Sequence, residues 1–271
     1  MIIKHIKEVL LCKPIYFTVE YAINPWMQPG TVDRNQAMRQ WNDLVNTLTT
    51  LEISVKFIDQ IADLPDMVFS TDQAITVGNK VLLSNFRYPE RRNESKYYKK
   101  WFEENDYSVN TLPNDLYLEG SGDCLSWGDI LFMGYGFRSS LDSAKTTASL
   151  LNMDVIPLEL INPKYYHLDL ALLPINSTSA IYYPKAFSQN SQKTLKKIIP
   201  DLYEFTEKEV SGFAANSLVT GNHVILQKNN PTFVNRIRKL GYYPIEIDIS
   251  EFLKAGGGIH CLVQILKEKY E

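Results

Sequence analysis

The sequence predicts an α/β fold in which one short unit of secondary structure occurs about five times. Each unit holds a strand, a tight turn, a second strand, a helix and a further strand. Two-residue turns such as Gly78-Asn79 and Gly221-Asn222 lie between apolar runs, which is the pattern of a β-hairpin. The hairpins begin near residues 75, 124, 170, 218 and 261. This regular spacing of 43 to 49 residues is typical of a repeat architecture, although the units share almost no sequence identity.

The helices of this pattern are expected over residues 34–52, 90–105, 140–152, 191–199 and 232–240. In the first of them, Trp41, Leu44 and Leu48 recur at helical spacing, and Asp33 is placed to cap its N-terminus. Strands are expected over residues 53–59, 154–160, 202–205 and 243–249. The last strand, 261–266, lacks a hairpin partner. The N-terminal strand, 8–12, is therefore expected to pair with it and to close the five units into a ring.

Composition places the 271-residue chain among globular proteins that bury a substantial core in one domain. The net charge of −3 and the lack of a basic tract argue against a nucleic-acid partner. No apolar run approaches the length of a membrane span, and the N-terminus lacks the pattern of a signal peptide. Three widely spaced cysteines, Cys12, Cys124 and Cys261, do not suggest a disulfide framework or a zinc site. A cytoplasmic location is therefore expected, with Cys12 and Cys124 in the core.

Polar residues stand at the start of the first strand of every unit. Asp72, Asp123 with Glu119 upstream, His167 with Asp169, and Asn216 mark the first four units, and Cys261 begins the fifth strand. In a ring these positions lie at the same end of the central axis, so a thiol, a histidine and several carboxylates converge there. Nucleophilic catalysis requires this combination of groups. Each acid taken alone is also explained as an ordinary turn residue.

The glycine run Gly256–Gly258 removes the side chains just before His260 and Cys261. Glycine lets another group approach the backbone closely, which favours an exposed nucleophile at Cys261. The alternative is a buried apolar cysteine in a late strand. If residue 261 begins a strand, the adjacent His260 points to the opposite face, away from the chemistry. Carboxylates that face a thiol suit a planar cation, and guanidinium is the cation that carboxylates match best.

With these residues in view, the chain resembles the guanidino-group-modifying superfamily, and within it the dimethylarginine dimethylaminohydrolase and amidinotransferase-like branch. The matching segments are Pro65–Phe69 with Asp72, Asn85–Arg87, Glu119–Asp123, Phe137-Arg138, His167–Asp169, Ala214–Asn216 and Gly256–Cys261. The resemblance implies a five-bladed α/β propeller with pseudo-fivefold symmetry, which agrees with the repeat count, and a single catalytic domain over residues 1–271.

The resemblance also implies roles for individual residues. Cys261 is the implied nucleophile, His167 the general acid and base, and Glu119 the group that orients the histidine or binds the guanidinium. The implied substrate-binding residues are Asp66, Asp72 and Asp169 for the cationic groups, Arg87 and Arg138 for an α-carboxylate, and Phe69, Asp123 and Asn216. For Phe69, which stands beside Val68, a place in the core is the more common role of such an aromatic. Glu119 and Asp123 are one residue further apart than in the family motif, so either a bulge absorbs the extra residue or Asp123 takes part of the role of Glu119.

The expected reaction is hydrolysis of a small guanidino compound, arginine or a methylated arginine, to citrulline and an amine or ammonia. It proceeds through a covalent thiouronium intermediate on Cys261, without a metal or an organic cofactor. Two alternatives use the same fold: an amidinotransferase, and an arginine deiminase or dihydrolase. A third is a non-catalytic ligand-binding protein. The sequence leaves open which guanidine is used and whether the chain is a monomer or a homodimer.

Overall fold

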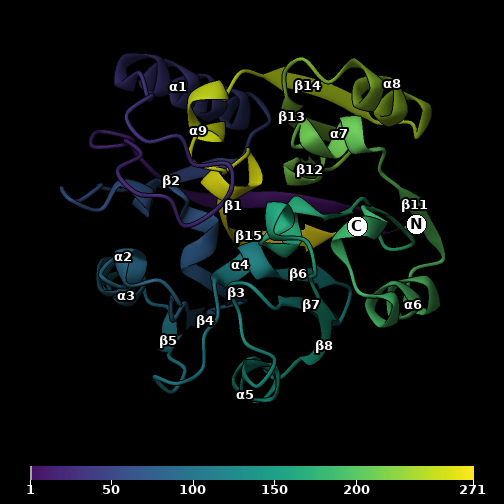
Figure 1. Ribbon diagram of the computed structural model, residues 1–271, viewed down its shortest axis with the longest axis horizontal. Coiled ribbons are helices and arrows are strands. Elements are labelled where there is room, and N and C mark those ends of the chain that lie inside the picture. Colours follow the sequence, from purple (N-terminus) through teal and green to yellow (C-terminus); the bar gives the residue numbers. More distant parts are fainter. Residues whose placement is uncertain (1) are drawn as a thin grey trace.

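Five three-stranded sheets surround a central axis in the computed structural model, which describes residues 2–271 (Figure 1). The sheets follow one another around the axis in chain order, and the first sheet also contains the last strand. In hydrogen-bonded order they are β15 (Gln264–Tyr270), β1 (Lys4–Cys12), β2 (Ser54–Ile58); β3 (Ala74–Val77), β4 (Lys80–Leu83), β5 (Ser108–Asn110); β6 (Cys124–Trp127), β7 (Ile130–Tyr135), β8 (Asp154–Glu159); β9 (Leu172–Pro174), β10 (Ser179–Tyr182), β11 (Asp201–Glu204); and β12 (Leu218–Thr220), β13 (His223–Gln227), β14 (Tyr243–Ile247). The expected five-bladed α/β ring is confirmed.

Every sheet has the same pairing pattern. The middle strand is antiparallel to its hairpin partner and parallel to the third strand, as β7 is to β6 and to β8. In the first sheet β1 is antiparallel to β15 and parallel to β2, so the N-terminal strand closes the ring as predicted. Parallel neighbours need a crossover connection, and the outer helices supply it.

The outer helices are α1 (Arg34–Thr50), α2 (Pro89–Arg92), α3 (Ser95–Glu104), α5 (Ser143–Leu151), α6 (Gln189–Ile198) and α8 (Pro231–Lys239). They confirm the five expected helical regions, except that residues 89–104 form two helices. Asp33 caps α1, since its Oδ1 accepts a 3.0 Å hydrogen bond from the Gln36 backbone N–H. Strand β5 was not expected from the sequence, and neither were the short helices α4 (Gly120–Asp123), α7 (Glu207–Ser211) and α9 (Ser250–Leu253).

A single helical turn precedes the first strand of each unit. These turns are residues 70–73, 120–123, 168–170, 214–216 and 260–262. The third and fifth units therefore begin their strands at Leu172 and Gln264, later than the predicted residues 170 and 261. Because successive side chains on a helical turn do not alternate between two faces, the expectation that His260 points directly away from Cys261 is wrong.

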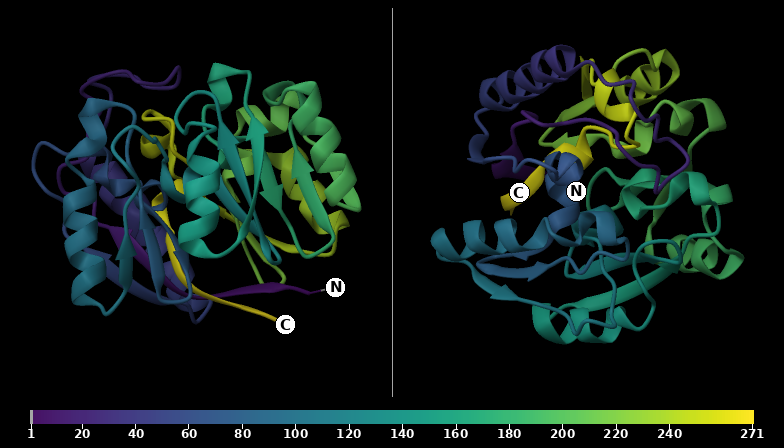
Figure 2. Two further views of the ribbon diagram at one scale, coloured as in Figure 1. Left: turned by 90° about the horizontal axis from the view of Figure 1, so that it is seen from below. Right: turned by 60° about the vertical axis from the view of Figure 1, so that its left-hand side comes forward.

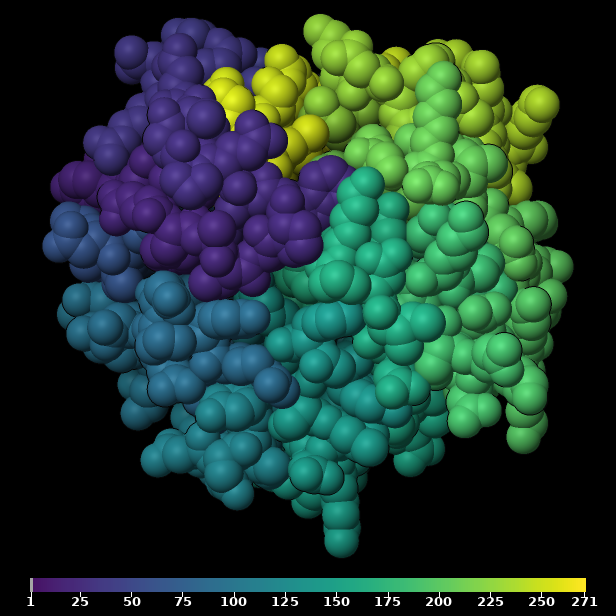
Figure 3. Space-filling view, in the orientation of Figure 1, coloured from purple at the N-terminus to yellow at the C-terminus, as the bar shows by residue number. Residues whose placement is uncertain are grey.

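The segment between β1 and α1, residues 13–33, crosses one end of the central axis. It lies in front of the ring in Figure 1, and in Figure 3 the purple N-terminal segment meets the teal segments near the centre of that face. The two ends of the chain lie side by side, as Figure 2 shows, and Ile3 exchanges two backbone hydrogen bonds with Glu271. Cys12 and Cys124 are buried among apolar residues, as predicted. Within residues 2–271, no helix combines the length and hydropathy of a membrane span.

Candidate active site

The five helical turns bring residues from distant parts of the chain to one end of the axis. They carry Asp72, Asp123, Asp169, Asn216 and Cys261, and all five side chains are buried. Neighbouring turns contact one another around the axis. These residues therefore converge as expected, but they lie on the helical turns and not on the strands.

Cys261 is held by its neighbours in the ring of turns. Its backbone N–H donates to Oδ1 of Asn216 at 3.1 Å, and its Sγ accepts from Nδ2 of Asn216 at 3.1 Å. The Sγ also lies 3.4 Å from Oδ2 of Asp169, which is within reach of a thiol S–H donor. Burial, together with Asp169 and Asp72, raises the pKa of the Cys261 thiol well above its usual range. The resting sulfur is therefore a neutral thiol.

The glycine run is required by close packing as well as by backbone geometry. Gly256 has a φ of +85°, and the Asn24 side chain lies against its α-carbon. A Cβ on Gly257 would overlap the ring of Phe69, and a Cβ on Gly258 would lie 2.5 Å from Oδ1 of Asn216. The glycines thus give room to the side chains that surround the thiol.

A buried chain of charged groups orients His167. Its Nε2 lies 2.8 Å from Oε2 of Glu119, and the same oxygen accepts from a terminal amino group of Arg138 at 2.7 Å. Burial alone would raise the pKa of Glu119, but Arg138 and His167 outweigh it and hold that pKa below its usual range. Burial alone would lower the pKa of His167, but Asp72, Asp123 and Glu119 outweigh it and raise the pKa to about 9. His167 is therefore protonated at neutral pH.

The one-residue departure from the family motif is absorbed by α4. One helical turn over residues 120–123 lets the Asp123 backbone N–H bond to the Glu119 carbonyl, so no bulge is needed. Asp123 has a structural role. Its carboxylate accepts hydrogen bonds from the backbone N–H and the hydroxyl of Ser139 and from the backbone N–H of Leu168. Neither acid lines the cavity at the thiol, but Glu119 contacts His167.

Arg91 was not singled out in the sequence. It is buried on α2, where it donates to Oδ2 of Asp72 at 2.6 Å and to Glu94 at 2.9 Å, and it lines the cavity beside Cys261. This pair fixes Asp72 so that its other oxygen lies 3.6 Å from Nδ1 of His167. The sequence signal was weak, because Arg91 stands next to Arg92 at the start of a helix and looks like a solvent-facing charge.

His260 belongs to the same network. Its Nδ1 lies 2.9 Å from Oδ2 of Asp169, the oxygen that faces the thiol of Cys261. With the alternating geometry of a strand at residue 261, His260 was expected to point away from the chemistry. The helical turn at 260–262 instead directs both side chains towards Asp169.

The segment 13–33 closes the site from the front. Tyr21 donates its hydroxyl proton to Oδ2 of Asp66 at 2.9 Å, and the Ile23 carbonyl accepts from Arg138 at 3.1 Å. Met27 lines the same cavity. The enclosed space at the thiol is about 10 Å³, which is room for about one water molecule. A ligand larger than water therefore needs residues that line this space to move, and segment 13–33 supplies three of them, Ile23, Asn24 and Met27.

Two other predicted residues have clear positions. Phe69 lines the cavity and packs edge-on against Phe17, so it is both a wall of the site and part of the core. Arg87 does not line the cavity; its Nε donates to the Arg138 carbonyl, and its guanidinium lies over Tyr117. Among residues 2–271, its terminal amino groups donate to no other group.

Three buried carboxylate oxygens of the site have no hydrogen-bond donor among the described residues: Oδ1 of Asp72, Oε1 of Glu119 and Oδ1 of Asp169. Leaving such groups unpaired costs about 1–3 kcal/mol each, more when they are charged. A bound molecule rich in N–H donors and positively charged satisfies them, and guanidinium, with five donors in a plane, fits that requirement.

Comparisons with known proteins show what this chain is similar to. The family model described as N,N dimethylarginine dimethylhydrolase, eukaryotic, matches residues 18–267. The N(G),N(G)-dimethylarginine dimethylaminohydrolase of Mycobacterium tuberculosis is 36% identical over 256 residues, 94% of this chain and 84% of that enzyme. The bifunctional arginine dihydrolase/ornithine cyclodeaminase ArgZ of Synechocystis sp. is 36% identical over 262 residues, 94% of this chain; the chain spans 37% of ArgZ. An ArgZ N-terminal-domain variant, solved covalently bound to a reaction intermediate, matches with a TM-score of 0.93 and 35% identity over 96% of this chain and 97% of that one.

Proposed function

Because the chain belongs to the N,N-dimethylarginine dimethylhydrolase family, we propose that it is a cysteine-dependent hydrolase of arginine or a methylated arginine. The observation that carries the proposal is a pair of unpaired buried acceptors at the Cys261 thiol. They are Oδ1 of Asp169, whose other oxygen lies 3.4 Å from the sulfur, and Oδ1 of Asp72, which lines the same cavity. Two relatives named for hydrolysis of such guanidines support it. We further propose that residues 1–271 act as one catalytic domain.

Substrate binding begins with the guanidinium group. Its N–H donors pair with Oδ1 of Asp72 and Oδ1 of Asp169, which places the central carbon beside the sulfur of Cys261. The terminal amino groups of Arg87 are available for the α-carboxylate of an amino-acid substrate. Arg138 contributes less to that carboxylate than the sequence suggested, because its charge is already paired with Glu119.

The first half-reaction forms the covalent intermediate. The positive substrate stabilises the thiolate of Cys261, which attacks the guanidinium carbon. His167 then donates the proton on Nδ1 to the departing nitrogen, since its Nε2 is committed to Glu119. The C–N bond breaks, ammonia or an amine leaves, and a thiouronium cation stays on the sulfur.

The second half-reaction releases the product. Neutral His167 now takes a proton from water at Nδ1, and the hydroxide adds to the thiouronium carbon. The second adduct collapses with loss of the hydroxyl proton to solvent, and the C–S bond breaks. Citrulline and the Cys261 thiolate result. The carboxylates of Asp72 and Asp169 stabilise the cationic carbon in both halves.

The deciding experiment is incubation of the purified chain with arginine, methylated arginines and agmatine, with assays for ureido product, ammonia and methylamines. We expect citrulline from arginine or a methylarginine, and none from the Cys261→Ser variant. Cys124→Ser is the matched control, because Cys124 is equally buried but lies outside the site. Product formed only after addition of an acceptor amine would assign an amidinotransferase. Binding without turnover or a mass adduct would assign a binding protein.

Two coarser properties complete the proposal. Three free cysteines within the described residues suit a reducing compartment, so we propose the cytoplasm as the location, to be tested by fractionation. We propose that the chain works as a monomer or homodimer without a nucleic-acid partner. Sedimentation of the purified protein distinguishes the two states.

A further inference from the structure

Asp72, Glu119 and Asp169 share one arrangement of hydrogen bonds. Each uses one carboxylate oxygen to accept from a buried side chain and leaves the other without a donor among residues 2–271. Oδ2 of Asp72 accepts from Arg91 at 2.6 Å, and Oε2 of Glu119 accepts from Arg138 at 2.7 Å. These two carboxylates therefore cannot rotate without breaking a buried ion pair.

The third carboxylate, Asp169, is held by His260. Its Oδ2 lies 2.9 Å from Nδ1 of the imidazole, and because a carboxylate oxygen can only accept, that nitrogen carries the hydrogen. Within the described residues, His260 is the one N–H donor to this carboxylate, and the other contact of Oδ2 is the sulfur of Cys261 at 3.4 Å. The place of Oδ2 beside the thiol thus depends on a single N–H donor.

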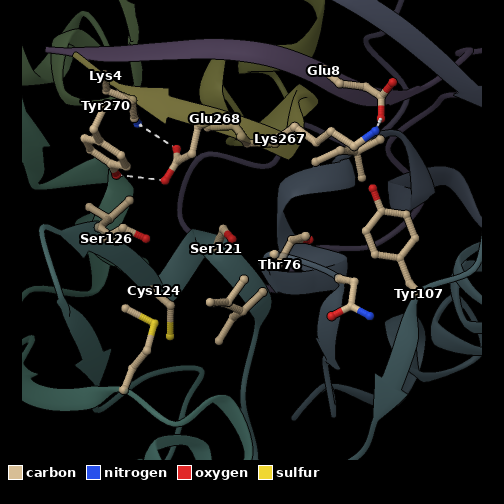
Figure 4. A pocket seen from close by; sticks show the side chains of 18 of the residues that line it. Lys4, Glu8, Thr76, Tyr107, Ser121, Cys124, Ser126, Lys267, Glu268 and Tyr270 are labelled. Atoms are coloured by element: carbon tan, nitrogen blue, oxygen red, sulfur yellow. Dashed lines mark hydrogen bonds and ion pairs between the residues drawn. The ribbon is translucent and has the colours of Figure 1, made fainter.

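His260 also borders a second cavity, of about 930 Å³. Figure 4 shows part of the lining of this cavity, including the ion pair between Lys267 and Glu8. For the part of the chain that the structure describes, the bond to Asp169 is the one side-chain hydrogen bond of the imidazole. A substitution of His260 therefore reaches the site through Asp169 and breaks no other hydrogen bond of the ring.

We propose that His260 is the positioning residue of Asp169, in the way that Arg91 holds Asp72. The N–H at Nδ1 fixes Oδ2 of Asp169 beside the sulfur and leaves Oδ1 for an N–H donor of the substrate cation. The inference rests on the hydrolase function proposed above, because it concerns how that site holds a guanidinium group. His260 acts through Asp169 and does not touch the substrate.

A carboxylate held in place favours a planar cation over a neutral molecule of the same shape, because only the cation gains from the charge and from paired N–H donors. Chloroacetamidine and chloroacetamide form such a pair: both alkylate a thiol, and only the amidine is a cation at neutral pH. The ratio of their rate constants with Cys261 therefore measures the carboxylates at the thiol. A general loosening of the fold changes both rate constants alike and cancels in the ratio.

The test compares variants of His260 with and without a donor at the place of Nδ1. His260→Ala and His260→Leu remove the donor, and the leucine keeps most of the volume of the ring; His260→Asn presents a side-chain amide N–H instead. Alkylation is followed as the mass of the peptide that contains Cys261, and turnover is measured in parallel. We expect the ratio of cationic to neutral alkylation, and kcat/KM, to fall about 10- to 100-fold without the donor, the effect of losing one buried hydrogen bond to a charged group. The asparagine variant should stay within about threefold of wild type.

His223→Ala is the matched control, since it removes an imidazole that packs on Tyr243 of β14, outside the site, and it should leave the ratio unchanged. An unchanged or raised ratio in His260→Ala and His260→Leu would overturn the proposal. A loss in His260→Asn as large as in His260→Ala would overturn it too, because the asparagine keeps the donor. Alkylation does not depend on hydrolysis, so the expected ratios without turnover of any guanidine would refute the proposed function and leave the role of His260 standing. Turnover with an unchanged ratio in the alanine variant would do the reverse.

Discussion

The interaction between Glu119 and His167 gives the sharpest quantitative prediction. The Glu119→Gln substitution removes a charge whose oxygen lies 2.8 Å from Nε2 of His167. An opposite charge this close favours the protonated histidine by about 1–3 pKa units, so the pKa of His167 should fall from about 9 to about 6–8. This equals about 1.4–4 kcal/mol of lost stabilisation of the imidazolium. At pH 8 the protonated fraction then falls from about nine-tenths to about half or less.

The measurement is the pH dependence of kcat/KM, which reports groups of the free enzyme. In the wild type, activity should fall as pH rises through about 9, because His167 loses the proton that it donates to the leaving group. In Glu119→Gln the same limb should move down by about 1–3 pH units. Titration of the imidazole by NMR gives an independent reading, and the chain has only four histidines to assign.

Loss of a buried ion pair also affects folding, because Arg138 keeps its charge without its partner, at a cost of about 3–5 kcal/mol. Glu209→Gln is the matched control: Glu209 is equally buried and paired with Arg236, but on α7, away from the site. It should lower stability and leave the pH profile unchanged. An unchanged upper limb in Glu119→Gln would refute the electrostatic account of His167.

Three further predictions concern the packing around the thiol. Gly258→Ala places a Cβ 2.5 Å from Oδ1 of Asn216, so it should cost about 1–3 kcal/mol in chemical unfolding and lower kcat at least tenfold; wild-type kcat would contradict the packing argument. Tyr21→Phe removes the 2.9 Å hydrogen bond to Asp66 and should loosen the front segment, seen as faster amide hydrogen exchange over residues 13–33; unchanged exchange would show that this bond does not hold the segment. Trp26→Ala removes the indole that donates to a backbone carbonyl at 2.7 Å, and should speed alkylation of the thiol by iodoacetamide; an equal rate would mean that the segment does not limit access.

Local patterns in the sequence determined the architecture of this protein. Two kinds of local signal were sufficient: apolar runs on either side of a two-residue turn, and helical spacing of apolar residues such as Trp41 and Leu44. Both signals depend only on residues close together in the chain, so they can be recognised without the rest of the fold. The even spacing of the hairpins then indicated a ring, and the unpaired last strand required the N-terminal strand as its partner. The convergence of Asp72, His167 and Cys261 at one end of the axis followed from that ring and from their places at the starts of first strands.

Only the tertiary structure decided how those residues work. The turn at 260–262 is set by contacts with Asn216, far away in the chain, so the sequence could not show that His260 faces Asp169. Arg91 is buried because it pairs with Asp72 inside the ring, although its neighbours in the sequence suggest an exposed start of a helix.

The division between Glu119 and Asp123 has the same origin. Both acids stand before a strand, and the sequence offered each of them to His167. Which one reaches the imidazole depends on the direction of a single helical turn and on where Ser139 and Leu168 present their donors. Hydrogen-bond partners of buried charges are chosen by three-dimensional proximity, because an unpaired buried charge is too costly to keep. Residue types therefore reveal which chemistry a chain can perform, while the packed fold assigns each group its proton and its partner.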